Sequence, residues 1–224
     1  RDQEVARLFL SANRFFGLPL RSNVFLSRER QDIGSSTDSP TDVQTVADVT
    51  EISAEQVFRL RRLIDLRYGY GIGRNRTTIS DSDFDLTVRV ARLQTSALVD
   101  RRSDPFDPAR GSFSSVSLEL SRPGLGADIS FIKSFVQRYE FVPIKDKLVL
   151  ASTARVGLAR TFRDEPLIQS ERFYAGGATS VRGYNENDLG PRSIFGDAHG
   201  GLAMLMVNGE LRFPVYRWVR GVGF

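Results

Sequence analysis

The sequence contains no cysteine among its 224 residues, a single histidine and no long apolar run. Without cysteine the chain has no disulfide framework, no thiolate zinc site and no cysteine nucleophile. The longest unbroken apolar run, Leu202 to Val207, has six residues, whereas a membrane-spanning helix requires roughly 18 to 20. Disulfide-bonded domains and helical membrane spans are therefore excluded.

Lysine is also scarce, with three residues against 28 arginines, and the formal net charge is +4. A nucleic-acid-binding protein gathers its basic residues on one helix or patch beside stacking aromatic residues. Here the arginines are dispersed, and several lie inside apolar alternating stretches, as at Arg67, Arg155 and Arg212. This pattern indicates a charged face that runs along many strands, and we expect no nucleic-acid partner.

Alternation with a period of two residues is the dominant pattern of the chain. In LIDLRYGYGIG the apolar Ile64, Leu66 and Tyr68 alternate with Asp65 and Arg67. The same period occurs in KLVLASTARVGLAR, SFSSVSLELS, FDLTVRV and NGELRF. It is typical of β-strands with one apolar and one polar face, so the sequence predicts an all-β protein.

Turn signals from Gly, Pro, Asn and Asp divide the chain into about ten strands. The strands are expected near residues 3–13, 19–32, 51–61, 64–75, 84–98, 112–122, 128–141, 148–163, 200–213 and 218–224. Several exceed the mean soluble strand of about 5 to 6 residues and match the roughly 9 to 11 that cross a bilayer with tilt. In the fifth strand the apolar phase slips after Arg92, which we interpret as a β-bulge.

Short and long connections alternate along the chain. Short ones are expected at residues 15–18, 62–63 and 143–146, and long polar ones at 33–50 and 164–199. This arrangement is typical of outer-membrane barrels. The first long connection belongs to an acidic stretch, residues 32–55, which we interpret as a solvated surface loop rather than a metal site.

The membrane barrel also predicts which row of side chains faces lipid, because a charge on the lipid face near the midplane costs about 2 to 4 kcal/mol. The residues expected to face lipid are Leu66, Tyr68, Leu118, Leu150 and Val156. Those expected to face the lumen are Arg67, Glu119 and Arg155. A soluble sandwich or lipocalin-like barrel, with the apolar rows inside, is the alternative, since alternation alone does not say which row faces inward.

The stretch FYAGGATSVRGY, residues 173–184, combines residue types suited to a loop inside a polar lumen. Gly176 and Gly177 permit positive φ and a close approach of the backbone to a wall. The planar guanidinium of Arg182 suits a carboxylate in a confined site. Gly183 leaves space, and Tyr184 adds apolar area with a polar tip.

Two catalytic or ligand-binding interpretations of this region are weaker. GGATSVRG could bind phosphate, but it lacks the Lys-Ser/Thr ending and a following helix. His199 with Asp197 and Ser193 could form a hydrolase triad, yet three residues so close in sequence on one loop seldom converge. We therefore expect no enzyme activity, no catalytic residue, no metal and no cofactor.

Three blocks of the sequence resemble the BamA/TamA family of outer-membrane assembly barrels, also described as the bacterial surface antigen type. ERFYAGGATSVRGYNENDLGP resembles the family's signature loop, which carries a Gly-Gly pair and a Val-Arg-Gly-aromatic (VRGF/Y) motif. The matching residues are Gly176, Gly177, Val181, Arg182, Gly183 and Tyr184. Residues 98–113 resemble a periplasmic turn of the family, and residues 200–214 resemble the strand that follows the signature loop.

The resemblance implies an antiparallel transmembrane β-barrel domain over residues 1–224, partial, with about ten of sixteen strands. POTRA domains and the first strands would precede this segment, and the last strands would follow it. Residues 164–199 would be an extracellular loop that folds into the lumen, where Arg182 pairs with acidic groups of the wall. Glu210 matches the family's wall glutamate, and Phe224 matches a strand phenylalanine two residues before a second acidic partner.

The same resemblance implies a protein of the bacterial outer membrane that assists the insertion, assembly or translocation of proteins there. The short connection after Tyr184 is closer to TamA-like members than to BamA. The expected partners are outer-membrane lipid, unfolded outer-membrane or secreted protein clients, and periplasmic or inner-membrane assembly partners. A two-partner-secretion pore and an outer-membrane barrel hydrolase that uses His199 are the alternatives.

Overall fold

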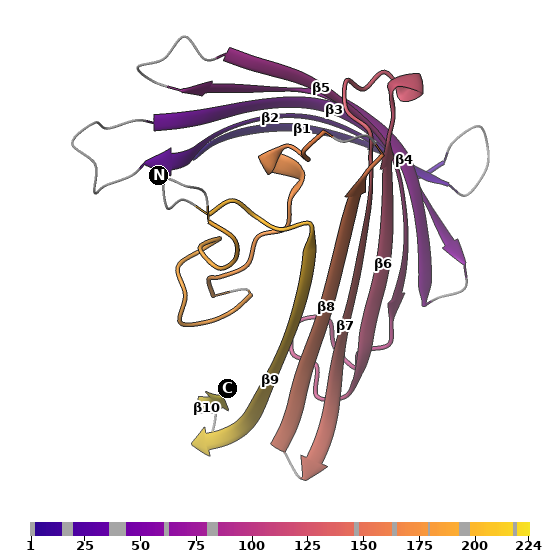
Figure 1. The fold of residues 1–224 in the computed structure, drawn as a ribbon. Coiled ribbons are helices and arrows are strands. Elements are labelled where there is room, and N and C mark those ends of the chain that lie inside the picture. The colour runs from indigo at the N-terminus through magenta and orange to yellow at the C-terminus, as the bar shows by residue number, and fades with distance from the viewer. Residues whose placement is uncertain are drawn as a thin grey trace.

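The computed structural model describes residues 3–14, 20–35, 44–60, 63–79, 85–145, 148–162, 165–178, 180–192, 198–216 and 219–224. Ten strands form one antiparallel sheet in which each strand pairs with its neighbours in the sequence (Figure 1). The strands are β1 (Gln3–Ala12), β2 (Arg21–Ser35), β3 (Gln44–Leu60), β4 (Ile64–Ile79), β5 (Asp85–Asp100), β6 (Gly111–Ser121), β7 (Phe131–Lys145), β8 (Leu148–Thr161), β9 (Ala203–Tyr216) and β10 (Val219–Gly223). Two short 3-10 helices, η1 (Pro123–Leu125) and η2 (Gln169–Glu171), lie in connections. The prediction of an all-β antiparallel protein with ten strands is confirmed.

The sheet is curved, and the connection between β8 and β9 lies on its concave side (Figure 1). We call this side the inner face and the convex side the outer face. Between the described residues, β1 and β10 do not pair with each other, so the sheet forms an open arc. Among the described residues, no helix has the length and the apolar character needed to cross a membrane.

The outer face is apolar, as the membrane barrel predicts. Tyr68, Leu118, Leu150 and Val156 are 38–49% exposed there, which confirms their predicted direction. On the opposite row, Glu119 lies among inner-face charges, so the assignment of faces holds on this strand as well. A soluble barrel would bury these apolar rows in a closed core, and the structure shows the reverse.

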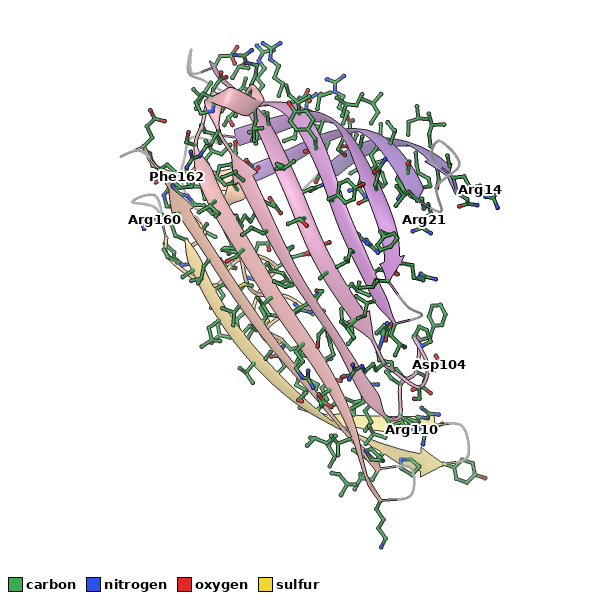
Figure 2. The ribbon with its side chains drawn as sticks, turned by 90° about the vertical axis from the view of Figure 1, so that its right-hand side faces the viewer. Arg14, Arg21, Asp104, Arg110, Arg160 and Phe162 are labelled. Carbon is green, nitrogen blue, oxygen red and sulfur yellow. The ribbon has the colours of Figure 1, made fainter. Side chains whose placement is uncertain are left out.

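Polar residues gather at the two ends of the outer face. Figure 2 shows this face, with Arg160 near one end and Asp104 and Arg110 near the other. The first end carries the long connection between β8 and β9, and the second carries the turn between β5 and β6. The apolar band between two polar ends is the surface that a barrel presents to a bilayer.

The long polar connection predicted over residues 33–50 is wrong. β2 extends to Ser35 and β3 begins at Gln44, and the two strands pair with each other up to these two residues, while residues 36–43 lie outside the described residues. Asp48, inside this range, accepts hydrogen bonds from Arg28 of β2 at both of its carboxylate oxygens, at 2.7 and 3.3 Å. Such cross-strand pairs stabilise a strand that is polar as well as alternating, so the acidic stretch is largely strand rather than loop.

The β-bulge predicted after Arg92 is also wrong, because β5 pairs with β4 without a register shift from Asp85 to Val99. The apparent slip has a different cause. Val90 and Ala91 are on opposite faces of β5, yet both are buried, at 3% and 0% exposure. Leu167 of the loop covers Val90 on the inner face, and the connection between β6 and β7 covers Ala91 on the outer face through Gly126.

Candidate functional site

The connection between β8 and β9 is anchored on the inner face first by an apolar cluster. Leu167, at 3% exposure, packs with Val90 of β5 and Phe131 of β7. Full burial of such a side chain contributes about 1.5 to 3 kcal/mol. The start of the loop is therefore fixed against two strands that are separated by β6.

A cluster of charged side chains, centred on Glu171, forms the next contact of the loop with the wall. The Glu171 carboxylate is 5% exposed and lies 3.1 Å from Arg92 Nη2 and 3.5 Å from Lys133 Nζ. Arg92 also lies 3.1 Å from Glu51 and 3.9 Å from Glu119. Burial raises the pKa of the Glu171 carboxyl, although Arg92 and Lys133 act in the opposite direction. With three carboxylates and two cations, the cluster favours one protonated acid.

His199, near the end of the loop, contacts Gln169 and Arg172. Its Nδ1 lies 3.3 Å from Nε2 of Gln169, and its carbonyl accepts a hydrogen bond from Arg172 Nη1 at 3.2 Å. Partial burial and the nearby Arg172 lower the pKa of His199. The other residues of the triad alternative, Ser193 and Asp197, lie outside the described residues. Within the described ranges, no group of three or more His, Asp or Glu side chains could hold a metal ion.

The two adjacent glycines form a tight crossing of the loop backbone. Gly176 and Gly177 have φ of 114° and 94°. The Gly176 N–H donates to Ser180 Oγ at 2.8 Å, and the Gly177 N–H donates to the Tyr184 carbonyl at 3.1 Å. A Cβ on Gly176 would stand 2.3 Å from the carbonyl oxygen of Asn185. Both the φ values and the close approach therefore require glycine.

Arg182 extends from this crossing to the last two strands. Its Nη2 donates to Oε1 of Glu210 on β9 at 2.5 Å, and its guanidinium lies over the Phe224 ring, 4.3 Å from the centroid. Arg212, on the same inner row, lies 3.6 Å from the second carboxylate oxygen of Glu210. The Arg182 and Glu210 side chains are 38% and 22% exposed, so water screens the pair in part.

The remaining residues of the motif have different surroundings. Val181 is half-buried, whereas Tyr184 is 57% exposed. A Cβ on Gly183 would meet nothing within 4 Å, and the φ of 89° is what favours glycine there. The structure thus brings Arg182, Glu210 and Phe224 together and leaves Tyr184 facing open space.

Sequence analysis missed the anchor formed by Glu171, Arg92 and Lys133. Its only signal in the sequence is the position of Arg92, which follows a run of apolar residues on the inner row of β5. A buried cation next to apolar residues requires an acidic partner from elsewhere in the chain. Glu171 is the first residue of the block that resembles the signature loop, and it is that partner.

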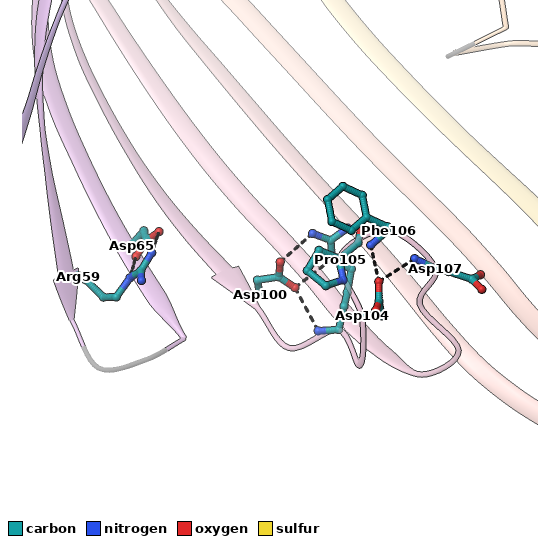
Figure 3. Close-up of polar contacts among 8 residues, drawn as sticks. Arg59, Asp65, Asp100, Asp104, Pro105, Phe106 and Asp107 are labelled. Atoms are coloured by element: carbon teal, nitrogen blue, oxygen red, sulfur yellow. Dashed lines mark hydrogen bonds and ion pairs between the residues drawn. The ribbon is translucent and has the colours of Figure 1, made fainter. Parts of the chain in front are cut away.

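The turn between β5 and β6 is ordered by its own side chains (Figure 3). Arg102 donates to both carboxylate oxygens of Asp100, at 2.9 and 2.7 Å. The Asp104 carboxylate accepts the backbone N–H groups of Phe106 and Asp107 at 2.7 and 3.0 Å. Both bonds lower the pKa of Asp104, and the bond from Asp107 has the larger effect. The ring of Phe106 is 98% exposed at the tip.

Together these features define part of the wall of a β-barrel, with the connection between β8 and β9 on its concave side. The crystal structure of BamA from Haemophilus ducreyi lacking POTRA domains 1–3 has the same fold, with a TM-score of 0.84 at 17% sequence identity. The similarity covers 96% of this chain and 46% of that one.

Residues 6–224 match the Omp85 superfamily domain, and the chain belongs to that superfamily. A sorting and assembly machinery component 50 homolog from Mus musculus is 34% identical over 111 residues, which are 50% of this chain and 23% of the relative. The outer membrane protein assembly factor BamA from Nitratidesulfovibrio vulgaris is 36% identical over 115 residues, 50% of this chain and 14% of the relative. The matched region therefore spans about a quarter or less of these relatives, and both animal and bacterial proteins match.

Proposed function

We propose that the protein containing this chain inserts, assembles or translocates other proteins at an outer membrane. The observation that carries the proposal is membership of the Omp85 superfamily over residues 6–224. The names of relatives from Nitratidesulfovibrio vulgaris and Neisseria meningitidis, outer membrane protein assembly factors, support it. Its clients would be unfolded outer-membrane or secreted proteins, and periplasmic or inner-membrane proteins would assist it.

The mechanism is edge pairing between the barrel and its client. A sheet edge in lipid exposes N–H and C=O groups that nothing in the hydrocarbon can satisfy. A client strand that pairs with the edge satisfies them, which is the physics of β-augmentation. The free energy would come from client folding, since the sequence carries no phosphate-loop motif.

Within this function the loop is a latch on the inner face. Arg182 binds Glu210 of β9 and stacks on Phe224, while Gly176 and Gly177 form the crossing that presents the arginine. Such a latch fixes the last two strands of the chain relative to the interior. It would keep the wall folded while the edge exchanges partners.

A finer assignment is to a TamA-like member of a bacterial outer membrane. The support is the short connection from Tyr184 to β9, residues 185–202. Purification of the protein from its source with its bound partners would test this assignment. Recovery of a multi-subunit outer-membrane complex of the BamA kind would contradict it.

The function is tested by reconstituting the full-length protein in lipid vesicles and adding a urea-denatured β-barrel client. We expect the client to reach its heat-modifiable folded form faster than with empty vesicles, and Arg182→Ala to reduce that acceleration. Equal rates with and without the protein would contradict the proposal. Client appearing inside the vesicles, protected from added protease, would identify a secretion pore instead, and loss of a hydrolytic activity on His199→Ala would identify an enzyme.

A further inference from the structure

The outer face has a sharp boundary between apolar and basic residues near the end that carries the long loop. Residues paired across neighbouring strands form rows, and one row from β2 to β5 is Leu26, Ile52, Ile72 and Ala91. The next outward-facing row toward that end is Arg28, Thr50, Arg74 and Arg89. A change from aliphatic to guanidinium side chains marks the level at which a barrel wall passes from hydrocarbon to headgroups.

Arg74 and Arg89 are direct cross-strand partners in this basic row. Like charges directly opposite each other destabilise a sheet. Arg89 has a counter-charge, since its Nη2 lies 2.9 Å from Asp128 Oδ1, and Arg28 and Arg76 also have acidic partners. In the part of the chain that the structure describes, no ion pair joins Arg74 to an acidic residue. The Arg74 and Arg89 pair thus carries an excess positive charge.

A cleft of about 720 Å³ lies at the same place. Its lining combines Leu26, Ile52 and Ile72 of the apolar row with Arg74 and Arg89 of the basic row. The cleft therefore offers an aliphatic surface on the bilayer side and, on the headgroup side, two guanidinium groups with the Asp128 carboxylate beside Arg89.

The connection between β6 and β7 forms one wall of the cleft by folding back over the outer face. The Asp128 N–H donates to the Arg89 carbonyl at 2.9 Å, and the Tyr70 hydroxyl donates to the Leu125 carbonyl at 2.7 Å. Ala127, between these contacts, is 5% exposed. These bonds hold the wall in place without any ligand, so the cleft is preformed.

We propose that this cleft binds the phosphate and one acyl chain of an anionic lipid of the surrounding leaflet. The phosphate lies between Arg74 and Arg89, and an acyl chain follows Leu26, Ile52 and Ile72. Guanidinium groups bind phosphate oxygens through paired charge-assisted hydrogen bonds, and an anion between the two arginines removes their repulsion. A headgroup with its own cation, such as choline, would place a like charge against the pair. The proposal rests on the membrane orientation of the outer face and is independent of assembly activity.

The test uses the full-length protein purified in detergent and titrated with phosphatidylglycerol or phosphatidylcholine, with bound lipid counted by native mass spectrometry. We expect the protein to retain phosphatidylglycerol in preference to phosphatidylcholine. Arg74→Gln should weaken that retention about tenfold, the effect of losing one hydrogen-bonded charge contact. The matched control is Arg160→Gln, at an exposed outer-face arginine of the same end outside the cleft (Figure 2), which should retain lipid like the parent protein.

Equal retention of phosphatidylglycerol by the parent protein and Arg74→Gln would overturn the proposal, as would a preference for phosphatidylcholine. Displacement of the lipid by inorganic phosphate at equal concentration would also overturn it, by showing a site for free anions. Heat-modifiable mobility on gels reports the fold of each variant. If Arg74→Gln does not fold, Ile52→Ser tests the acyl contact, and retention unchanged by that substitution would reject the site. Client assembly is not part of the readout, so failure here leaves the proposed function standing.

Discussion

Gly157 of β8 lies directly against the ring of Phe173, so closely that a Cβ at position 157 would stand 2.7 Å from two ring atoms. The ring has neighbours on other sides: Phe135, with 6.3 Å between centroids, and Lys133, whose ammonium is 5.3 Å from the ring centroid. These contacts restrict movement of the ring. The absence of a side chain at position 157 is what allows the loop to approach the wall.

Gly157→Ala should therefore weaken the attachment of the loop. We expect the free energy of unfolding to fall by about 1 to 3 kcal/mol, as for other overpacked contacts. The measurement is urea unfolding of the heat-modifiable form of the full-length protein. Gly209→Ala on β9 is the control, since a Cβ there would meet nothing within 4 Å. It should be neutral or stabilising by about 0.4 to 1 kcal/mol, and equal losses from the two changes would show that Phe173 does not depend on Gly157.

Arg182→Ala and Glu210→Ala should each destabilise the barrel and reduce client assembly. Each change should lower the free energy of unfolding by about 1 to 3 kcal/mol. Breaking a fully buried ion pair costs more, roughly 3 to 5 kcal/mol, but water reaches both of these side chains. The double mutant should be little worse than either single one, since the partners share one interaction. Glu186→Ala, an exposed acid of the same loop, is the control and should have no effect. Additive losses in the cycle would reject the latch.

Arg92→Gln should destabilise the protein far more than Glu171→Gln, although the two residues are partners. Without Arg92, Lys133 is the only cation among the described residues that forms an ion pair with Glu51, Glu119 or Glu171. We therefore expect Arg92→Gln to lower the free energy of unfolding by about 3 kcal/mol. Glu171→Gln removes the surplus negative charge and should change stability by less than about 1 kcal/mol. Urea unfolding at neutral pH would measure the stability of both variants. Equal losses of stability would contradict the excess of negative charge that we assign to the cluster.

The pH dependence of this cluster follows from the direction of the Glu171 pKa. Burial raises it above the value in the unfolded chain, so the folded state binds the proton more tightly. The stabilisation is complete below the unfolded pKa and is lost as the pH rises through the raised folded pKa. Stability of the parent protein should therefore fall across this window relative to Glu171→Gln, and parallel pH profiles would refute the assignment.

Leu118→Arg should impair folding into vesicles far more than Ser117→Arg. The two residues are neighbours on β6 that face opposite sides of the sheet, and Leu118 is 42% exposed on the outer face. Arginine on the lipid face costs about 2 to 4 kcal/mol near the midplane, whereas Ser117 faces a polar interior. Comparable folding midpoints for the two variants would place Leu118 away from lipid.

Asp104 should lose its two backbone hydrogen bonds in acid. Its folded pKa is depressed by the N–H groups of Asp107 and Phe106, so its stabilisation is present above the unfolded pKa and is lost as the pH falls through the folded value. Hydrogen exchange at the Phe106 and Asp107 amides should show protection that decreases in this window. Asp104→Ala should remove the protection at every pH, and unchanged exchange in that variant would show that other contacts order the turn.

The number and direction of the strands could be predicted because apolar and polar residues alternate within each strand, and this pattern depends on local sequence alone. The boundary at residues 33–50 could not, since Ser, Thr, Asp and Pro around residues 36–43 obscured the polar alternation on both sides. That alternation is stabilised by pairs such as Arg28 with Asp48, which depend on strand register rather than on local composition.

The two anchors of the loop differed in how far they could be predicted. Glu210 was identified as a candidate partner of Arg182 because both lie in blocks that resemble a known family. Glu171 and Arg92 are 79 positions apart and meet only because the sheet curves. No local pattern in the sequence encodes that curvature, so the charge cluster became visible only in three dimensions.

The two anchors also have a mechanical consequence. The loop is attached to β5 through Glu171 and Arg92 and to β9 through Arg182 and Glu210. It therefore connects two distant strands across the concave side of the sheet. Flattening the arc would stretch the segment between residues 171 and 182, and tightening it would slacken that segment. The curvature of the wall and the docking of the loop are therefore coupled, and widening the arc between β5 and β9 would strain both ion pairs.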